Sequence, residues 1–458
     1  MTQRWIRHRS SGETRTSQLL EGPIVRTLFR LATPNIFNLA ALSIMVMADV
    51  FFAGWIGPAG LEAATLVFPF KMLMQQMAAS GMGGAVSAAI ARSVGADSRQ
   101  HANAVAAHGL IIGATMAAGF GAVMLTCGPA IYHALGGYGE GLQMSISYSR
   151  LIFAGAIALW LFNILASIIR GTGNMSVPAM AVAAIALLDV ALSPVLMFGW
   201  GPFPRLGMVG AGIGFITSFA AGAGILSAFL ISGGTVLKPS LHGMRIRRAI
   251  LAEILRVGAR GSLNVAITNL AVILITGLVG RIGANALAGY GLASRIEYLI
   301  IPLIFSFGTA VVTLVAANAG AGQRPRAERI AWSGAAIVAA ITAMIGLGLA
   351  CFPATWMAIF TSDPAITDVG LRYLRIVAPV YAFYGVGIAL YYASQAFGRV
   401  AWPVVANGVR LCLAVGGGGY ALALGQGLTG LFTAIAISFV IYGILIVAAV
   451  ITGRWQGA

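Results

Sequence analysis

Long apolar runs, separated by short polar segments, recur along the whole chain. A run of about 20 apolar residues is long enough for a helix to cross the hydrocarbon core of a bilayer. The pattern predicts an all-α polytopic membrane protein with twelve transmembrane helices. The predicted spans are residues 28–54, 62–92, 104–126, 146–170, 178–199, 207–232, 250–279, 288–318, 330–352, 372–396, 402–424 and 428–451.

A repeated pattern relates the two halves of the chain. The segment GWIGPAGL at 54–61 returns as GRIGANAL at 280–287, and CGPAIY at 127–132 returns as CFPATW at 351–356. Six helices per half is an even number, so both halves enter the membrane in the same direction. We expect an N-terminal segment at 1–27, an N-lobe at 28–232, a basic loop at 233–249 and a parallel C-lobe at 250–458.

The composition agrees with a membrane protein. With 59% hydrophobic and 9% charged residues, the chain has more apolar surface than a soluble core hides. The three cysteines, Cys127, Cys351 and Cys412, are far apart in sequence, so neither a disulfide framework nor a metal cluster is expected.

The net charge of +16 is explained by topology. Basic residues gather before the first span, after the second, between the halves and after the eighth, whereas the loops 127–145 and 353–371 contain no Lys or Arg. The positive-inside bias then predicts an inner-membrane protein with both termini cytoplasmic. No nucleic-acid-binding pattern accompanies the charge, so nucleic acid is not an expected partner. Residues 1–22 lack the apolar core of a removable signal peptide.

Two acidic residues, Asp49 and Asp189, fall inside predicted spans of the first half. The helical rise of about 1.5 Å per residue places both carboxyl groups in the outer half of the same lobe. An ionised Asp near the bilayer centre costs about 2.5 to 3.5 kcal/mol on insertion scales, so such an acid is expected to face a cavity, a cation or a proton path. We interpret the pair as a shared ion-coupling site that holds Na⁺ or a proton.

Neutral oxygen ligands are expected beside these acids. Ser193 lies one turn after Asp189, and Thr217 lies in the next span. Hydroxyls inside membrane helices also bond back to their own backbone. In the alternative interpretation, Asp49 is solvated at the outer interface and Asp189 caps or pairs locally. The repeat aligns Asp49 with Ile275, so the acid has no counterpart in the second half.

Several motifs, in order and spacing, resemble the multidrug and toxic compound extrusion (MATE) transporters. They are LEGPI at 20–24, LATP at 31–34, DVFFAGWIG at 49–57, LEAA at 61–64, GTGNMSVP at 171–178 and FGRVAWP at 397–403. The resemblance covers nearly the whole chain. It implies a V-shaped pair of six-helix lobes around a central cavity, and a monomer without cofactors that exports organic, often cationic or amphiphilic, drugs in exchange for Na⁺ or H⁺.

The resemblance also assigns residues. Asp49 matches the family's first-helix acid and Pro34 its bending proline. In span five, many members place Asn and then Asp four residues apart before a proline, whereas this chain has Asp189 and then Ser193. Some members carry an embedded Glu in span seven, but this chain has no acid around Thr268. Coupling is therefore expected in the N-lobe.

The substrate site is predicted from polarizable and aromatic residues that suit a promiscuous amphiphile pocket. The candidates are Met45, Met72 and Gln75 in the first half and Tyr381 and Tyr384 in span ten. The alternative is that these side chains pack inside the lobes or touch lipid.

Lys71 and Glu297 occupy equivalent positions of the repeat with opposite charge. They are expected either to pair across the lobe interface or to be held locally, with Arg295 as a nearby partner for Glu297. Both alternatives stay open at this point.

Two other functions are considered. A lipid-linked oligosaccharide flippase of the same superfamily should line its cavity with positive residues that hold pyrophosphate, and Arg260, Arg281 and Arg295 are candidates. A membrane enzyme is not expected, because His108 alone among the histidines falls within a predicted span and no catalytic constellation emerges.

Overall fold

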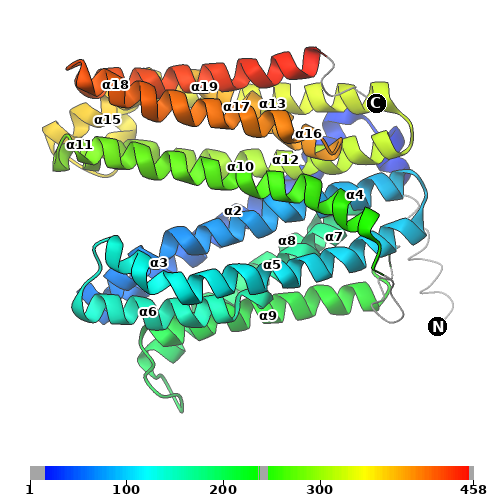
Figure 1. The fold of residues 1–458 in the computed structure, drawn as a ribbon, viewed down its shortest axis with the longest axis horizontal. Coiled ribbons are helices and arrows are strands. Elements are labelled where there is room, and N and C mark those ends of the chain that lie inside the picture. Colours follow the sequence, from blue (N-terminus) through cyan, green and yellow to red (C-terminus); the bar gives the residue numbers. More distant parts are fainter. Residues whose placement is uncertain (1–15, 236, 238–245, 453–458) are drawn as a thin grey trace.

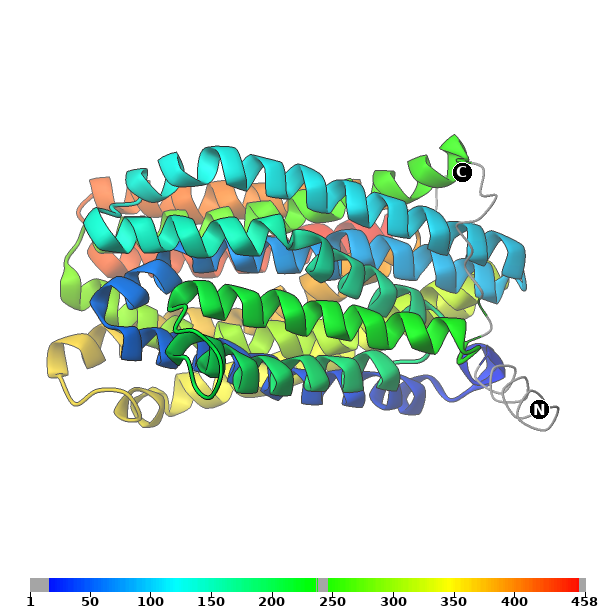
Figure 2. The ribbon, with the colours of Figure 1, turned by 90° about the horizontal axis from the view of Figure 1, so that it is seen from below.

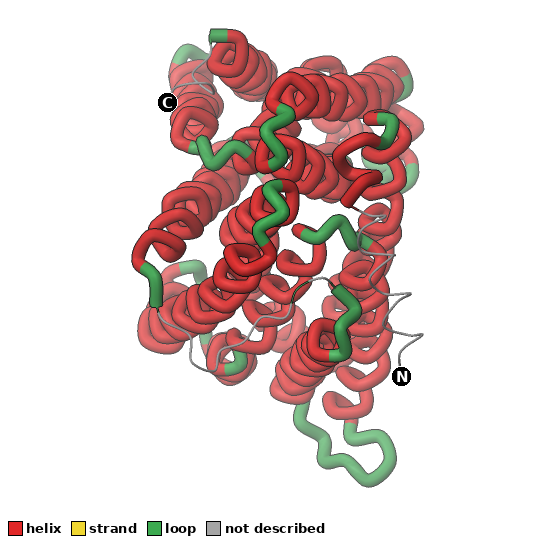
Figure 3. Tube along the Cα trace, turned by 90° about the vertical axis from the view of Figure 1, so that its right-hand side faces the viewer, coloured by secondary structure: helices red, strands yellow, loops and turns green. Residues whose placement is uncertain are grey.

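The computed structural model describes residues 16–235, 237 and 246–452 of the chain. The predicted N-terminal segment and basic inter-lobe loop lie largely outside the described residues, as do the last six residues of the predicted C-lobe. The described residues form helices and short connections, with no strand among them (Figure 3). The predicted all-α fold class is confirmed.

The first half contains six spans. Their elements are α2 (Ile24–Ile56), then α3 (Pro58–Gln76) continued by the π-helix η1 (Met77–Met82) and α4 (Gly83–Gly95), then α5 (Arg99–Ala134), the pair α6 (Gly139–Ala154) and α7 (Ala156–Gly171), α8 (Ser176–Phe198) and α9 (Met208–Ile231).

The second half repeats this order. Its elements are α10 (Arg248–Gly280), α11 (Ala284–Ser294) with α12 (Glu297–Gly320), α13 (Arg324–Cys351), a short α14 (Pro353–Ala358), α15 (Pro364–Val377) with the 3₁₀ turn η2 (Ala378–Val380) and α16 (Tyr381–Ala396), α17 (Ala401–Cys412) with the π-helix η3 (Leu413–Gly417) and α18 (Gly418–Ala423), and α19 (Gly427–Ile451).

The twelve predicted spans correspond to these elements one by one. Within the described residues, nine helical segments are individually long and apolar enough to cross a membrane, and α6 with α7 forms a further span bent by 45°. The remaining two spans are interrupted by η1 and η3. π-Helical turns inside α-helices are locally irregular, and they are tolerated at membrane depth where neighbouring protein covers them.

The two halves form separate groups of helices. Figure 1 shows α2 to α9 on one side of the molecule and α10 to α19 on the other, with most helices along the long axis. The same direction of the helices is seen from below in Figure 2. The groups come together at the end where α4 and the described ends of the chain lie, and they diverge toward the end with α3 and α11 (Figure 1).

Two equivalent glycines allow the lobes to approach closely at this end. Gly95 ends α4 and Gly320 ends α12. A methyl group at Gly95 would lie 1.9 Å from the carbonyl oxygen of Ala317, and a methyl group at Gly320 would lie 2.0 Å from the carbonyl oxygen of Arg92. Each glycine thus lies against the backbone of the opposite lobe. Residues that lack a side chain let helix backbones approach in membranes, so this crossing depends on both glycines.

The lobe contact should open when either glycine acquires a side chain. We expect Gly95→Ala and Gly320→Ala to increase the distance between the lobes at this end, because a backbone carbonyl cannot move aside as a flexible side chain does. The measurement is a spin-label distance between Gln100→Cys and Arg324→Cys, with Cys127, Cys351 and Cys412 replaced by serine. Gly277→Ala in α10 is the matched control, because a methyl group there meets nothing within 4 Å. Distances equal to the control in both variants would contradict this account.

Candidate functional site

The centre of the N-lobe holds a buried ion pair between Lys71 and Asp49. The helices α2 and α3 are neighbours joined at Gly57, whose φ of 119° suits a residue without a side chain. The Lys71 ammonium donates a hydrogen bond to Asp49 Oδ2 at 2.6 Å, and the two side chains are only 6% and 12% exposed. Asp49 is therefore enclosed and paired, and the alternative of a solvated acid at the outer interface is not what the structure shows.

Two aromatic residues complete the surroundings of this ammonium. The Lys71 Nζ lies 4.9 Å from the ring centroid of Phe215 on α9, and it interacts with the hydroxyl of Tyr148 on α6. Both aromatic side chains are buried. A cation over an aromatic face is attracted by the ring quadrupole, so helices α2, α3, α6 and α9 together fix the position of the charge.

Asp189 lies beside this pair on α8 and is 1% exposed. The Ser193 hydroxyl, one turn later, donates to Asp189 Oδ1 at 3.1 Å. Asp189 also interacts with the carboxyl group of Asp49. The structure therefore brings together three of the four predicted ion-coupling residues, Asp49, Asp189 and Ser193. Their role in coupling stays a prediction.

Helix α9 faces Asp189 with Ser218 rather than with the predicted Thr217. Glycines set the register: a methyl group at Gly214 would meet Ser193 Oγ at 2.3 Å, and a methyl group at Gly222 would meet Ile185 at 2.3 Å. Because α8 and α9 run in opposite directions, Ser218 comes opposite Asp189. Thr217 is exposed, whereas Ser218 is completely buried. Thr217 thus lies off the face of α9 that meets Asp189, and its role as a ligand stays a prediction.

Two oxygens in this register have unused hydrogen-bonding capacity. Asp189 Oδ2 and Ser218 Oγ are both buried and have no hydrogen-bond partner. A buried polar atom without a partner is costly, and the cost is larger for a charged group. Carboxylate and hydroxyl oxygens are ligands that suit Na⁺, and a proton on Asp189 would also satisfy the free oxygen. The described residues contain no cluster of three or more His, Cys, Asp or Glu that could hold a metal.

Pro34 lies inside α2, in its first half and 15 residues before Asp49. Its ring removes one backbone donor, so α2 is weakened there. The next residue, Asn35, donates to Thr309 of α12 at 2.9 Å and to the sulfur of Met175 at 3.7 Å. The proline therefore adjoins a hydrogen bond between the lobes. Bending at Pro34 stays a prediction.

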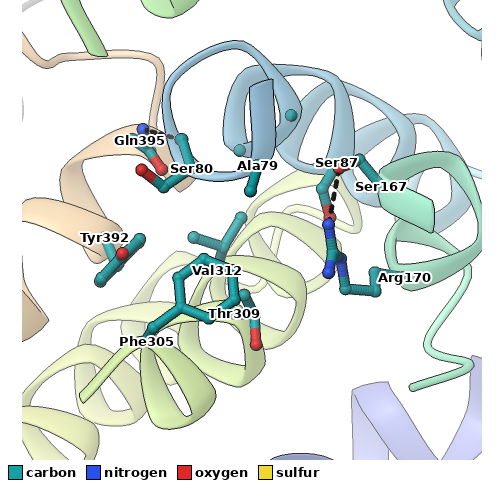
Figure 4. Close-up of a pocket in the computed structure, with 12 residues that line it drawn as sticks. Ala79, Ser80, Ser87, Ser167, Arg170, Phe305, Thr309, Val312, Tyr392 and Gln395 are labelled. Carbon is teal, nitrogen blue, oxygen red and sulfur yellow. Dashed lines mark hydrogen bonds between the residues drawn. The ribbon is translucent and has the colours of Figure 1, made fainter. Parts of the chain in front are cut away.

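A second buried cation, Arg170, lies where the lobes meet. Arg170 of α7 is 6% exposed, donates to Ser167 Oγ at 2.9 Å and lies 6.0 Å from the ring centroid of Phe305 of the C-lobe. The side chain lines a small cavity between the two lobes (Figure 4). The volume of this cavity is about 10 Å³, which is room for about one water molecule. No carboxylate of the described residues forms an ion pair with it. The cavity is lined by Ala79, Ser80, Gly83, Gly84, Ser87, Ser167, Arg170, Phe305, Thr309, Val312, Tyr392 and Gln395.

The C-lobe differs chemically from the N-lobe. Glu297, equivalent to Lys71, accepts hydrogen bonds from the hydroxyls of Tyr373 and Tyr381. The predicted pairing of Lys71 with Glu297 across the interface is therefore not formed, and both residues are held locally. Arg295, the suggested neighbour of Glu297, instead lies 5.8 Å from the Phe360 ring centroid.

A polar group on α17 reaches the core of the same lobe. The buried Arg410 donates to Asn407 Oδ1 at 2.8 Å, and Asn407 in turn donates to Asn264 Oδ1 at 2.9 Å and to Thr268 Oγ1 at 3.0 Å. Tyr384 stacks on Phe439 with ring centroids 4.4 Å apart, and Arg410 lies 5.5 Å from the Tyr384 ring centroid. Span seven thus contributes the amide of Asn264 and the hydroxyl of Thr268 to this polar cluster.

Three of the five predicted substrate residues pack inside the lobes. Met45, Tyr381 and Tyr384 are 3%, 1% and 6% exposed. Other side chains enclose these three in this conformation, and their role as substrate contacts stays a prediction. Met72 and Gln75 are partly exposed, and Gln75 Oε1 has no hydrogen-bond partner. Substrate contact stays a prediction for these two.

The arginines considered for a pyrophosphate site do not form one cluster. Arg260 and Arg281 are 21 residues apart along α10, which corresponds to roughly 30 Å of helix. Arg260, Arg281 and Arg295 are all exposed. The arrangement expected of a pyrophosphate-binding flippase is not present among them.

Comparison with known proteins identifies the family. The sequence pattern of the MatE family matches residues 34–195 and 262–418, which lie in the two halves. The chain belongs to the MATE family. It is therefore a multi-pass membrane protein of a transporter family, and the resemblance of its motifs to MATE transporters is confirmed.

Relatives of nearly the same length match most of the chain. An FAD transporter of Shewanella oneidensis is 25% identical over 395 residues, which are 86% of this chain and 87% of the relative. The probable multidrug resistance protein YoeA of Bacillus subtilis is 24% identical over 408 residues, 86% of each chain. A solved structure described as the outward-facing conformation of a multidrug resistance MATE family transporter of the MOP superfamily has a TM-score of 0.87 at 25% identity and covers 96% of this chain and 98% of that one.

Lys71 was not predicted from the sequence as the partner of Asp49. Lys71 is an isolated basic residue inside an apolar span, which is itself a signal of function in membrane proteins. The same signal was available for Arg170 and Arg410. Weighing intramembrane basic residues together with the acids would have found all three.

The neighbouring hydroxyls on α9 allow the predicted ligand Thr217 to be compared with Ser218, which lies opposite Asp189. We expect Ser218→Ala to raise the half-saturating concentration of the coupling cation in this MATE-family protein about fivefold, because one hydrogen bond contributes about 1 kcal/mol. Thr217→Ala is the matched control and should leave it unchanged. Cation dependence of transport in proteoliposomes is the measurement. A larger effect of Thr217→Ala than of Ser218→Ala would restore the original assignment.

Proposed function

We propose that this MATE-family protein is a secondary active exporter of small organic, cationic or amphiphilic drugs. Export is driven by entry of Na⁺ or H⁺ at the N-lobe carboxylates Asp49 and Asp189. The observation that carries this proposal is the buried, unpartnered Oδ2 of Asp189 beside the Asp49 carboxyl group. A cation bound between oxygens of this kind compensates a charge that the lobe otherwise keeps at considerable cost.

Exchange follows from competition for this negative charge. A cationic drug and the coupling cation are each stabilised by the same carboxylate. Binding of one therefore lowers the affinity of the site for the other, which is released more readily. Entry of the coupling cation changes the charge next to α2, and Pro34 provides a place where this helix can bend. Release of drug is then coupled to movement of the first helix.

The orientation follows from the basic segments. We place the protein as a monomer in the inner membrane, with both termini cytoplasmic, since the basic residues flank the spans at the end where the described ends of the chain lie. The lobes meet at that same end, through Gly95 and Gly320. This conformation is therefore closed toward the cytoplasm, and it suits release of drug on the opposite side.

Arg170 favours a second candidate substrate class. The buried guanidinium without a carboxylate partner, next to Phe305 and Tyr392 of the other lobe, suits an aromatic anion. The relative from Shewanella oneidensis is named an FAD transporter, and FAD belongs to this class. Export of an anionic cofactor is the alternative to export of cationic drugs.

One transport assay tests both candidates. Proteoliposomes are loaded with either a cationic dye or FAD, and release is followed under an imposed Na⁺ or pH gradient. We expect gradient-dependent release of the dye, loss of most of this rate in Asp189→Asn, and a milder loss of about fivefold in Ser193→Ala, because a hydroxyl contributes about 1 kcal/mol. Asp368→Asn, which changes an acid on α15 that is 56% exposed, is the control.

The outcomes separate the alternatives. Release of FAD without release of the dye would replace the drug by an organic anion. Absence of any gradient effect on either substrate in the wild type would refute secondary active export. Full activity of Asp189→Asn would remove this carboxylate from coupling.

A further inference from the structure

The two carboxylates of the N-lobe are not equivalent. Asp49 Oδ2 receives the Lys71 ammonium at 2.6 Å, and the pair is enclosed, with side chains 12% and 6% exposed. Asp189 receives one donor hydroxyl, from Ser193 on Oδ1, no donor contacts its Oδ2, and its carboxyl group lies against that of Asp49. The lobe thus supplies a cation for one acid and only a neutral hydroxyl for the other.

Lys71 is held in its position by more than Asp49. Its ammonium lies 4.9 Å from the ring centroid of Phe215 and interacts with the Tyr148 hydroxyl, and these residues come from α9 and α6. Glycine at 214, next to Phe215, allows α9 to lie against Ser193 of α8. The cation is therefore a built part of the same site, and it is not a surface lysine that folds inward.

The formal charges of these three residues determine which further ions the site can bind. With both acids ionised, the two carboxylates and the one ammonium carry a single net negative charge, and burial makes compensation of this charge favourable. A second added cation would meet a site that is already neutral and would be disfavoured. The Asp189 carboxylate, which lies opposite Ser218 in the register of α8 and α9, is the place where the single added charge fits.

We propose that Lys71 is the specificity-determining residue of the N-lobe site: as an internal cation it occupies Asp49 and leaves Asp189 as the one carboxylate for exchange. This inference rests on the proposed function of cation-driven export. The site then takes one monovalent cation, either Na⁺ or H⁺, or one singly charged organic cation. Doubly charged organic cations are excluded because the second charge has no partner.

A structural role alone makes a different prediction. If Lys71 only stabilises the lobe, its replacement lowers the amount of folded protein and the rate, but the number of cations exchanged per substrate stays the same. The number of cations per substrate therefore distinguishes a residue that sets the charge of the site from one that only packs.

The test compares Lys71→Met with Lys71→Arg in proteoliposomes. Methionine keeps an unbranched side chain without charge, and arginine keeps the charge. The coupling ratio is measured from the opposing Na⁺ or H⁺ gradient that just halts flux of a singly charged dye. We expect a doubling of the number of cations per dye in Lys71→Met, because Asp49 is released, and the wild-type ratio in Lys71→Arg. A doubly charged dye should be transported by Lys71→Met and not by the wild type.

A binding measurement covers the case in which Lys71→Met does not support transport. Equilibrium binding of ²²Na⁺, and uptake of protons on a pH step, are measured on the purified full chain with Asp189→Asn and Lys71→Met. We expect Lys71→Met to bind twice the wild-type amount of the coupling cation and Asp189→Asn to lose binding. An unchanged amount in Lys71→Met overturns the inference. Absence of gradient-driven transport in the wild type instead refutes the proposed function, so the two failures are distinguishable.

Discussion

The compensation of buried negative charge organises the N-lobe. Two carboxylates lie within one bundle of apolar helices, where an uncompensated charge costs several kcal/mol. The Lys71 ammonium compensates the charge of Asp49, whereas Asp189 receives only a hydrogen bond from the Ser193 hydroxyl. The aromatic ring of Phe215 and the glycines of α9 are arranged around these groups. The remaining need for one positive charge links the structure of the lobe to its proposed exchange of cations.

The C-lobe has the same order of helices as the N-lobe, but its buried charges have different partners. Glu297 occupies the position equivalent to Lys71 of the N-lobe and accepts hydrogen bonds from two tyrosine hydroxyls. Arg410 donates a hydrogen bond to Asn407 of the asparagine cluster. Helices at equivalent positions of the two lobes therefore enclose different polar and charged side chains. The two halves are alike where the lobes contact each other, because Gly95 and Gly320 each lie against the backbone of the opposite lobe. The lobes differ at the residues of the proposed ion site.

The spans, the two halves and the closeness of Asp49 and Asp189 followed from sequence alone, because apolar length and helical rise determine them. The position of Ser218, rather than Thr217, opposite Asp189 was not predicted, because the rotation of α9 depends on which glycines face α8. The partner of Lys71 was not evident, since contact between α2 and α3 depends on the turn at Gly57 rather than on the repeat. Tyr381 and Tyr384 were predicted as substrate residues, and periodicity cannot separate a buried aromatic face from one that lines a cavity.

The most direct test removes both members of the internal ion pair. Asp49→Asn alone leaves Lys71 to neutralise Asp189, so gradient-driven export should be lost. The double variant Asp49→Asn with Lys71→Met keeps the single negative charge on Asp189, and the account predicts recovery of cation-dependent export to within about threefold of the wild type, because no uncompensated partner is left buried. Export is measured in proteoliposomes at equal protein content. A double variant as inactive as Asp49→Asn alone would contradict the claim that charge balance at Asp189 is what couples the cation to transport.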